Sequence, residues 1–220
     1  MTAFGGATKT GKSLLHAPEQ KFIKWAIPKL PKFLMSHHLT YMTLAWSGLT
    51  IAFGFLADND LVWIHGISVM ALMQWLTDSL DGSLGKYRKQ GLVRWGFFMD
   101  HILDFVFGGS IVIAYALFAP PEFEFLLLLL LLATGTIMAS SFLSFASSNS
   151  FQVAFFGIGP TEVRIVYVAM NTFVWLFGTN VFWWGIPLVL AVNLVASIVL
   201  IARSSKELWH LDKANNVDAN

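Results

Sequence analysis

The sequence lacks cysteine and has few charged residues. Without cysteine, the chain of 220 residues has no disulfide, no thiolate metal site and no cysteine nucleophile. Only 12% of its residues are charged, whereas a soluble domain carries about 25%. The 14 Lys and Arg residues are scattered between apolar runs, which argues against a nucleic-acid-binding surface. Because 56% of the residues are hydrophobic, we expect one compact membrane domain.

Long apolar runs predict six transmembrane helices. A bilayer core about 30 Å thick needs about 20 apolar residues per helix. The predicted spans are residues 38–57, 61–77 (continuing as helix to about 85), 93–118, 125–148, 162–177 and 181–202. We therefore predict an all-α integral membrane protein, with a six-helix catalytic domain at 38–203 between tails at 1–37 and 204–220.

The positions of the basic residues predict the orientation in the membrane. The connections at 58–60, 119–124 and 178–180 contain no Lys or Arg, so all 14 basic residues lie in the other segments. Cytoplasmic loops of membrane proteins carry an excess of Lys and Arg. Both termini, the loop at about 86–94 and the segment around Arg164 are therefore expected to face the cytoplasm.

Residues 18–35 interleave lysines with aromatic and aliphatic side chains. This composition predicts an amphipathic segment that lies at the membrane interface among lipid head groups. Pro28 and Pro31 would interrupt a single helix there, so we expect two short pieces. A disordered basic tail is the alternative interpretation.

Four aspartates lie near the ends of two neighbouring spans. Asp78 and Asp81 are three residues apart, and Asp100 and Asp104 are four apart, so each pair shares one helical face. A charge within a span costs about 2.5 to 3.5 kcal/mol, and the spans hold no comparable number of cations. The cluster therefore implies a bound divalent metal, and oxygen ligands favour Mg²⁺, Mn²⁺ or Ca²⁺ over zinc. Exposed loop charges or helix caps are the alternative, but apolar residues surround the aspartates.

Small and basic residues accompany the aspartates. Gly82 follows Asp81, and Gly96 lies one helical turn before Asp100, so a ligand can approach the backbone of both helices. The adjoining segment is basic, with Lys86, Arg88, Lys89 and Arg94. A pyrophosphate held by two metals on carboxylates, next to such cations, is typical of phosphoryl transfer.

This pattern resembles a known family. The chain contains Asp78-x-x-Asp81-Gly82-x-x-Gly85-Lys86, followed after nine residues by Gly96-x-x-x-Asp100-x-x-x-Asp104. This arrangement is similar to the signature of the CDP-alcohol phosphotransferases, which is D-x-x-D-G-x-x-A-R followed after about eight residues by G-x-x-x-D-x-x-x-D. The predicted layout of spans is also similar to that family over nearly the whole chain. Gly85-Lys86 departs from the usual Ala-Arg. Because lysine lacks the guanidinium fork, Arg88 is an alternative donor-binding cation.

The resemblance implies transfer of a phosphoalcohol unit from a CDP-linked donor to a hydroxyl, with release of CMP, in phospholipid biosynthesis. It also implies a homodimer and two divalent ions, Mg²⁺ or Mn²⁺. The implied metal ligands are Asp78, Asp81, Asp100 and Asp104, where Asp104 either completes the metal site or acts as base. The implied donor-binding residues are Gly82, Gly85, Lys86, Arg88 and Gly96.

Two further residues resemble one branch of this family. His101 follows Asp100, and Thr161-Glu162-Val163 opens the fifth span, as in choline and ethanolamine phosphotransferases. This implies that Glu162 orients His101 and that His101 takes the proton from a lipid hydroxyl. The simpler interpretations are a polar residue of the helix interior for His101 and a helix N-terminal charge for Glu162.

We therefore expect a CDP-choline or CDP-ethanolamine donor and diacylglycerol or a similar lipid acceptor. One alternative is a CDP-diacylglycerol donor with a small polar alcohol as acceptor. A more distant alternative is a carboxylate-based ion or metal transporter. Transport predicts polar groups across the whole bilayer, whereas the four aspartates lie at one depth.

Overall fold

The structure, a computed structural model, describes residues 8–10, 15–148, 150–152 and 160–217. Parts of both predicted tails, 1–7, 11–14 and 218–220, lie outside the described residues. Six long helices form the fold: α2 (Ser36–Ala57), α3 (Ile64–Tyr87), α4 (Val93–Phe118), α5 (Glu124–Ser148), α6 (Pro160–Phe177) and α7 (Phe182–Val217). They are preceded by α1 (His16–Ala26), and four short 3-10 turns join them: η1 (Ile27–Lys29), η2 (Leu61–Trp63), η3 (Pro121–Phe123) and η4 (Thr179–Val181).

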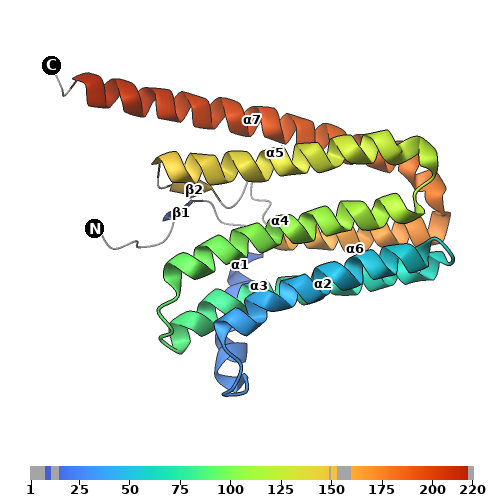
Figure 1. Cartoon of the computed structure of the whole chain (residues 1–220), viewed down its shortest axis with the longest axis horizontal. Helices are drawn as coiled ribbons and strands as arrows, with labels where there is room; N and C mark the ends of the chain where they lie inside the picture. The colour runs from blue at the N-terminus through green and yellow to red at the C-terminus, as the bar shows by residue number, and fades with distance from the viewer. Residues whose placement is uncertain (1–7, 11–14, 149, 153–159, 218–220) are drawn as a thin grey trace.

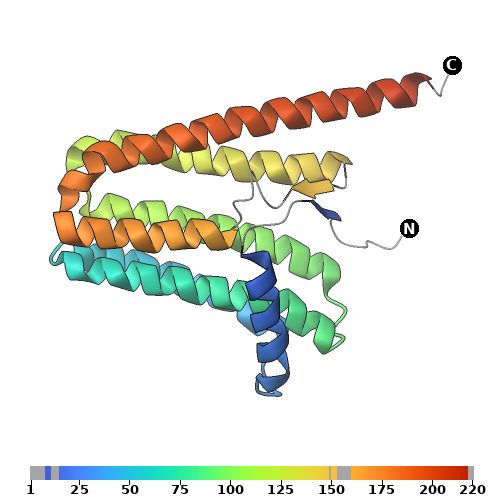
Figure 2. The same ribbon diagram turned by 180° about the vertical axis from the view of Figure 1, so that it is seen from behind.

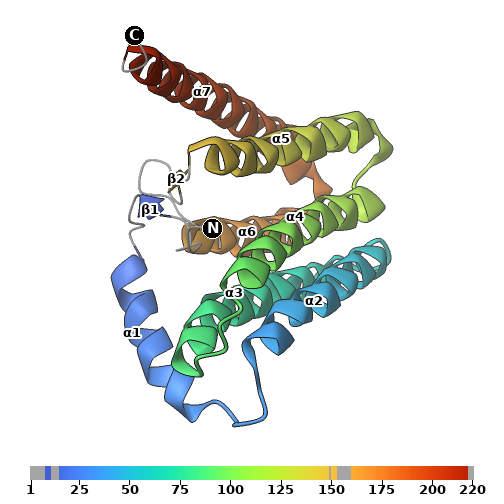
Figure 3. The same ribbon diagram turned by 60° about the vertical axis from the view of Figure 1, so that its left-hand side comes forward.

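The long helices are arranged in three layers of two. α5 and α7 form one layer, α4 and α6 the next, and α2 and α3 the third (Figures 1 and 3). α1 lies across the other helices rather than along them (Figure 2). Two three-residue strands, β1 (Thr8–Thr10) and β2 (Ser150–Gln152), pair in parallel with Thr8 opposite Ser150. The described chain is otherwise built of helices and their connections.

Four helices of the described chain are long and apolar enough to cross a membrane, at Ser36–Ala57, Val93–Phe118, Pro121–Ser147 and Thr179–Lys213. α3 and α6 lie where two further spans were predicted, but neither is among the described helices that are long and apolar enough to cross a membrane. Helix α7 continues to Val217, so most of the predicted tail from residue 204 is helical. Apart from the short pair of strands, the described chain thus has a helical, membrane-type fold.

Charge is segregated between the two ends of the bundle. The connections at 58–63, 119–123 and 178–181 lie together at one end and contain no Lys or Arg (Figure 1). They hold the acidic residues Asp58, Asp60 and Glu122. The connection from α3 to α4 lies at the opposite end and contains Arg88 and Lys89. The four aspartates lie at this basic end.

The segment predicted to lie at the membrane interface, residues 18–35, is divided near Pro28. α1 ends at Ala26, and η1 contains Pro28 at its second position, as expected from the missing amide hydrogen of proline. The buried residues of this segment, Ile23, Ala26 and Ile27, pack against Leu39, Leu80 and Leu84. In contrast, Trp25 is 60% exposed and Phe33 is 77% exposed. The segment therefore has one face on the bundle and one face free to meet lipid.

The contact between α2 and α4 depends on one glycine. A Cβ atom added at Gly54 would lie 2.6 Å from the Cα and carbonyl oxygen of Ala114, which is backbone that cannot move aside. Gly48, on the same helix, has no such neighbour within 4 Å. Gly54 thus lets α2 approach α4 closely.

We predict that Gly54→Ala lowers the free energy of unfolding by about 1 to 3 kcal/mol, because overpacking forces the two helices apart. Thermal unfolding of the purified chain in detergent measures the change. Gly48→Ala is the matched control and should be neutral or slightly stabilising, because alanine is the better helix former. Equal stability of the two variants would contradict the prediction.

Candidate functional site

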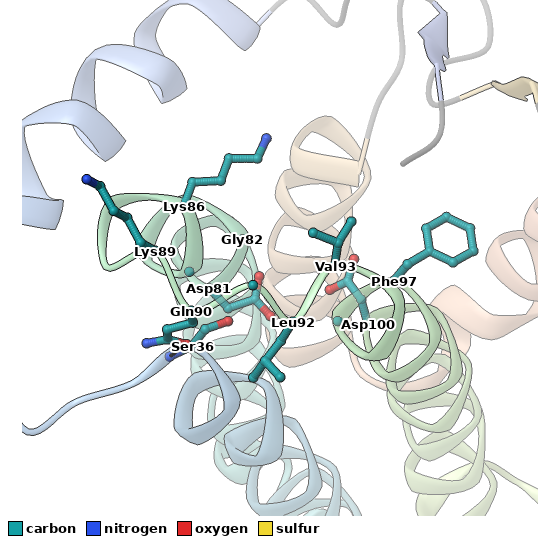
Figure 4. Close-up of a pocket in the computed structure, with 13 residues that line it drawn as sticks. Ser36, Asp81, Gly82, Lys86, Lys89, Gln90, Leu92, Val93, Phe97 and Asp100 are labelled. Atoms are coloured by element: carbon teal, nitrogen blue, oxygen red, sulfur yellow. Dashed lines mark hydrogen bonds between the residues drawn. The ribbon is translucent and has the colours of Figure 1, made fainter. Parts of the chain in front are cut away.

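A pocket of about 260 Å³ lies between the end of α3 and the start of α4. Asp81 and Asp100 face each other across it, while Lys86 and Lys89 extend outward from the end of α3 (Figure 4). The nine other lining residues are Ser36, Gly82, Gly85, Gln90, Gly91, Leu92, Val93, Gly96 and Phe97. The pocket therefore joins two of the predicted metal ligands to four of the predicted donor-binding residues.

The structure brings the four aspartates into one cluster. Asp100 interacts electrostatically with Asp78, Asp81 and Asp104. Asp81 is buried, and the other three are half-buried. Helix geometry explains the grouping, since residues three or four apart share a face and the faces of α3 and α4 meet at this end of the bundle.

Three of these carboxylates have specific protein donors. Asp78 accepts a hydrogen bond from Nη2 of Arg164 at 3.3 Å in an ion pair. Asp104 accepts from Nε2 of Gln74 at 2.9 Å, and Asp81 accepts from Oγ1 of Thr40 at 2.8 Å. The donors come from α6, α3 and α2 respectively, so three different helices hold the three carboxylates.

The predicted metal ligands have the right chemistry for a divalent ion, but their side chains are not arranged to hold one. Carboxylate oxygens are the ligands that Mg²⁺ and Mn²⁺ prefer. Within the described residues, however, no three His, Cys, Asp or Glu side chains are grouped so that they could hold a metal ion. Asp78, Asp81 and Asp104 each accept a hydrogen bond from a protein donor instead.

The glycines leave open space on the pocket wall. A Cβ atom at Gly82 or Gly96 would meet no neighbouring atom within 4 Å, whereas one at Gly85 would lie 3.3 Å from Oγ of Ser36. Gly91, in the connection to α4, has a φ of +70°, a conformation that glycine adopts without strain. The small residues thus keep the pocket mouth unobstructed.

Arg88 binds backbone carbonyl groups and does not line the pocket. Its guanidinium donates to four carbonyl oxygens of the segment after α1, those of Leu30, Pro31, Lys32 and Leu34. These contacts tie the segment before α2 to the end of α3. Among the predicted donor-binding cations, Lys86 rather than Arg88 therefore lines the pocket, and Lys89 lines it too.

His101 lies against aromatic side chains on α4 and α5. Its ring centroid is 4.2 Å from that of Phe97 and 5.4 Å from that of Phe142. Its Nδ1 lies 2.7 Å from the carbonyl oxygen of Phe97. Because a carbonyl has no proton to give, Nδ1–H is the donor, and in the neutral ring Nε2 keeps the lone pair that a general base needs.

Glu162 contacts the start of the N-terminal helix. Its Oε1 accepts a hydrogen bond from the backbone N–H of Leu15 at 2.8 Å. The neighbouring Thr161 donates to Glu19 at 3.1 Å and accepts from the indole N–H of Trp75 at 3.2 Å. The start of α6 is thus fastened to both α1 and α3. The predicted pairing of Glu162 with His101 stays a prediction.

Gln74, Arg164 and Thr40 are site residues whose roles the motif analysis missed. Gln74 lies four residues before Asp78, so the sequence alone places both residues on one face of the helix. Thr40 and Arg164 belong to α2 and α6, and their partners depend on how those helices pack on α3. Sequence spacing within one helix carries no signal for such contacts.

Comparison with known proteins gives no relative: no family model, no curated protein and no solved structure matches this chain.

Replacing Arg88 by lysine should destabilise the protein by about 1 to 2 kcal/mol, because an ammonium group cannot reach several carbonyls as the guanidinium does. The free energy of unfolding in detergent tests this. Lys206→Arg, the reverse exchange at an exposed position of α7, is the control and should change it by less than about 0.5 kcal/mol. Equal effects of the two changes would contradict the structural role of Arg88.

Proposed function

We propose that this protein transfers a phosphoalcohol unit from a CDP-linked donor, CDP-choline or CDP-ethanolamine, to a lipid hydroxyl such as that of diacylglycerol, with release of CMP. The observation that carries the proposal is the pocket in which Asp81 and Asp100 face each other beside Lys86 and four glycines. Acidic and basic groups that line one open pocket suit a phosphate-bearing ligand that binds together with metal ions.

The donor would bind at the pocket with its phosphates near the carboxylates. Asp78, Asp81, Asp100 and Asp104 would hold two divalent ions, Mg²⁺ or Mn²⁺, which neutralise pyrophosphate charge when bound. Lys86 and Lys89 would attract the phosphates from the rim. The open space at Gly82 and Gly96 would let the donor lie against the helix backbone.

The lipid hydroxyl would be deprotonated by His101. The Phe97 carbonyl fixes the proton on Nδ1, so Nε2 is the acceptor. Phe97 and Phe142 surround the ring, and Phe145 lies 4.5 Å from Phe97 between ring centroids. An apolar wall beside a base favours a lipid alcohol over a small polar one.

In the membrane, all six long helices would span the bilayer, with the basic end of the bundle in the cytoplasm. The segregation of charge between the two ends supports this orientation. The exposed Trp25 and Phe33 would then lie at the interface, beside the acidic pocket. A water-soluble CDP-linked donor and a membrane lipid could both reach a site at this depth.

Purified protein in lipid, incubated with Mg²⁺ or Mn²⁺, should release CMP from CDP-choline or CDP-ethanolamine when diacylglycerol is present. Asp81→Asn should lower the rate about 100-fold or more, because the amide weakens metal binding while its oxygen still accepts from Thr40. Asp58→Asn, at the opposite end of the bundle, is the matched control and should leave the rate unchanged.

Absence of CMP with every CDP-linked donor would refute the proposed reaction. Release from CDP-diacylglycerol with a small alcohol, but from neither CDP-choline nor CDP-ethanolamine, would keep the reaction class and overturn the choice of substrates.

For the proton transfer, His101→Ala should lower CMP release by about 100-fold or more, within the usual contribution of a general base. His210→Ala, on the exposed end of α7, is the control and should leave the rate unchanged. Near-normal turnover of His101→Ala, together with loss of activity in Asp104→Asn, would assign the base to Asp104 instead.

A further inference from the structure

Arg164 supplies positive charge inside the aspartate cluster. Its Nη2 pairs with Asp78 at 3.3 Å, and its Nε donates to Oε1 of Gln74 at 3.0 Å. Nη2 also donates to the same Gln74 oxygen. The side chain of Arg164 is only 11% exposed, and that of Asp78 is 22% exposed. Water therefore screens this pair less than it screens a surface ion pair.

Gln74 extends the influence of Arg164 to a second carboxylate. The amide of glutamine has one acceptor atom and one donor atom. Because its oxygen accepts from Arg164, its Nε2 is directed to Asp104, at 2.9 Å. Gln74 is 1% exposed, so turning its amide would leave buried polar atoms without partners. One guanidinium thus fixes Asp78 on α3 directly and Asp104 on α4 through Gln74.

Four carboxylates in an apolar bundle repel one another unless cations neutralise them. The guanidinium supplies one such charge with fixed geometry. A divalent ion bound to Oδ2 of Asp78 would share the oxygen that accepts from Arg164 and would repel the guanidinium. Binding of the two cations at Asp78 is therefore competitive.

We propose that Arg164 is an internal counter-ion, which holds Asp78 and, through Gln74, Asp104 while the cluster has no divalent ion. Asp78 leaves Arg164 when this carboxylate takes a divalent ion. The inference rests on the metal-binding part of the proposed function. It makes Arg164 and Gln74 positioning residues, which keep the carboxylates ordered and neutralised before the site is loaded.

Arg164→Gln in the purified full-length chain tests the proposal, with Mn²⁺ as the probe. Free Mn²⁺ measured by electron paramagnetic resonance gives the dissociation constant. We expect Arg164→Gln to bind Mn²⁺ about tenfold more tightly than the native protein, because no charge-assisted hydrogen bond has to break. Lys206→Gln also removes one positive charge, at an exposed site on α7, and should bind Mn²⁺ as the native protein does.

Thermal unfolding gives a second readout. Without Mn²⁺, Arg164→Gln should unfold at a lower temperature than the native protein, because its carboxylates have lost their counter-ion. With Mn²⁺, its unfolding temperature should rise by more than that of the native protein, since tighter binding to the folded state stabilises it more. Arg164→Lys keeps the charge without the fork and should give intermediate values in both measurements.

Folded Arg164→Gln that binds Mn²⁺ no more tightly than the native protein would overturn the proposal. If Arg164→Gln does not fold, Arg164→Lys decides, and unchanged Mn²⁺ affinity in that variant would also overturn it. Mn²⁺ binding that follows the expected order without CMP release from any donor would refute the reaction and leave the counter-ion in place. No Mn²⁺ binding by any of the proteins would refute both.

Discussion

Repulsion among four carboxylates at one end of an apolar helix bundle is the constraint on which the site depends. Each of three carboxylates is met by a donor from a different helix: Asp81 by Thr40, Asp78 by Arg164 and Asp104 by Gln74. These hydrogen bonds hold α2, α3, α4 and α6 together at the end where lysines and glycines line the pocket. The packing of four helices and the chemistry of the site therefore rest on the same contacts.

The long helices could be predicted because the length of an apolar run is a direct physical requirement for crossing a bilayer. Their ends were less predictable. Asp60 accepts from the backbone N–H of Val62 and caps η2, so α3 begins at Ile64 rather than at residue 61. At the other extreme, α7 continues past Ala202 because residues 203–217 contain no glycine or proline. Polarity marks where a helix leaves apolar surroundings, not where it stops.

The aspartate cluster could be predicted from spacing, but its partners could not. Residues three or four apart share a face whatever the tertiary fold, which is why Asp78, Asp81, Asp100 and Asp104 were found from sequence. Arg164 and Thr40 are 86 and 41 residues away from their carboxylates, and only the packing of α6 and α2 on α3 brings them close. Arg88 illustrates the same limit, since its position in the motif did not reveal its carbonyl partners.

The fastening of α1 to α6 constrains the order in which the protein can be assembled. Leu15 meets Glu162 across 147 positions of the chain, and Glu19 meets Thr161 across 142. During synthesis from the N-terminus, α1 has to wait for the fifth long helix before these bonds can form. Arg164 emerges at the same time, so α2, α3 and α4 are made before the cation that pairs with Asp78. The end that holds the four aspartates can therefore close only after α6 has been made.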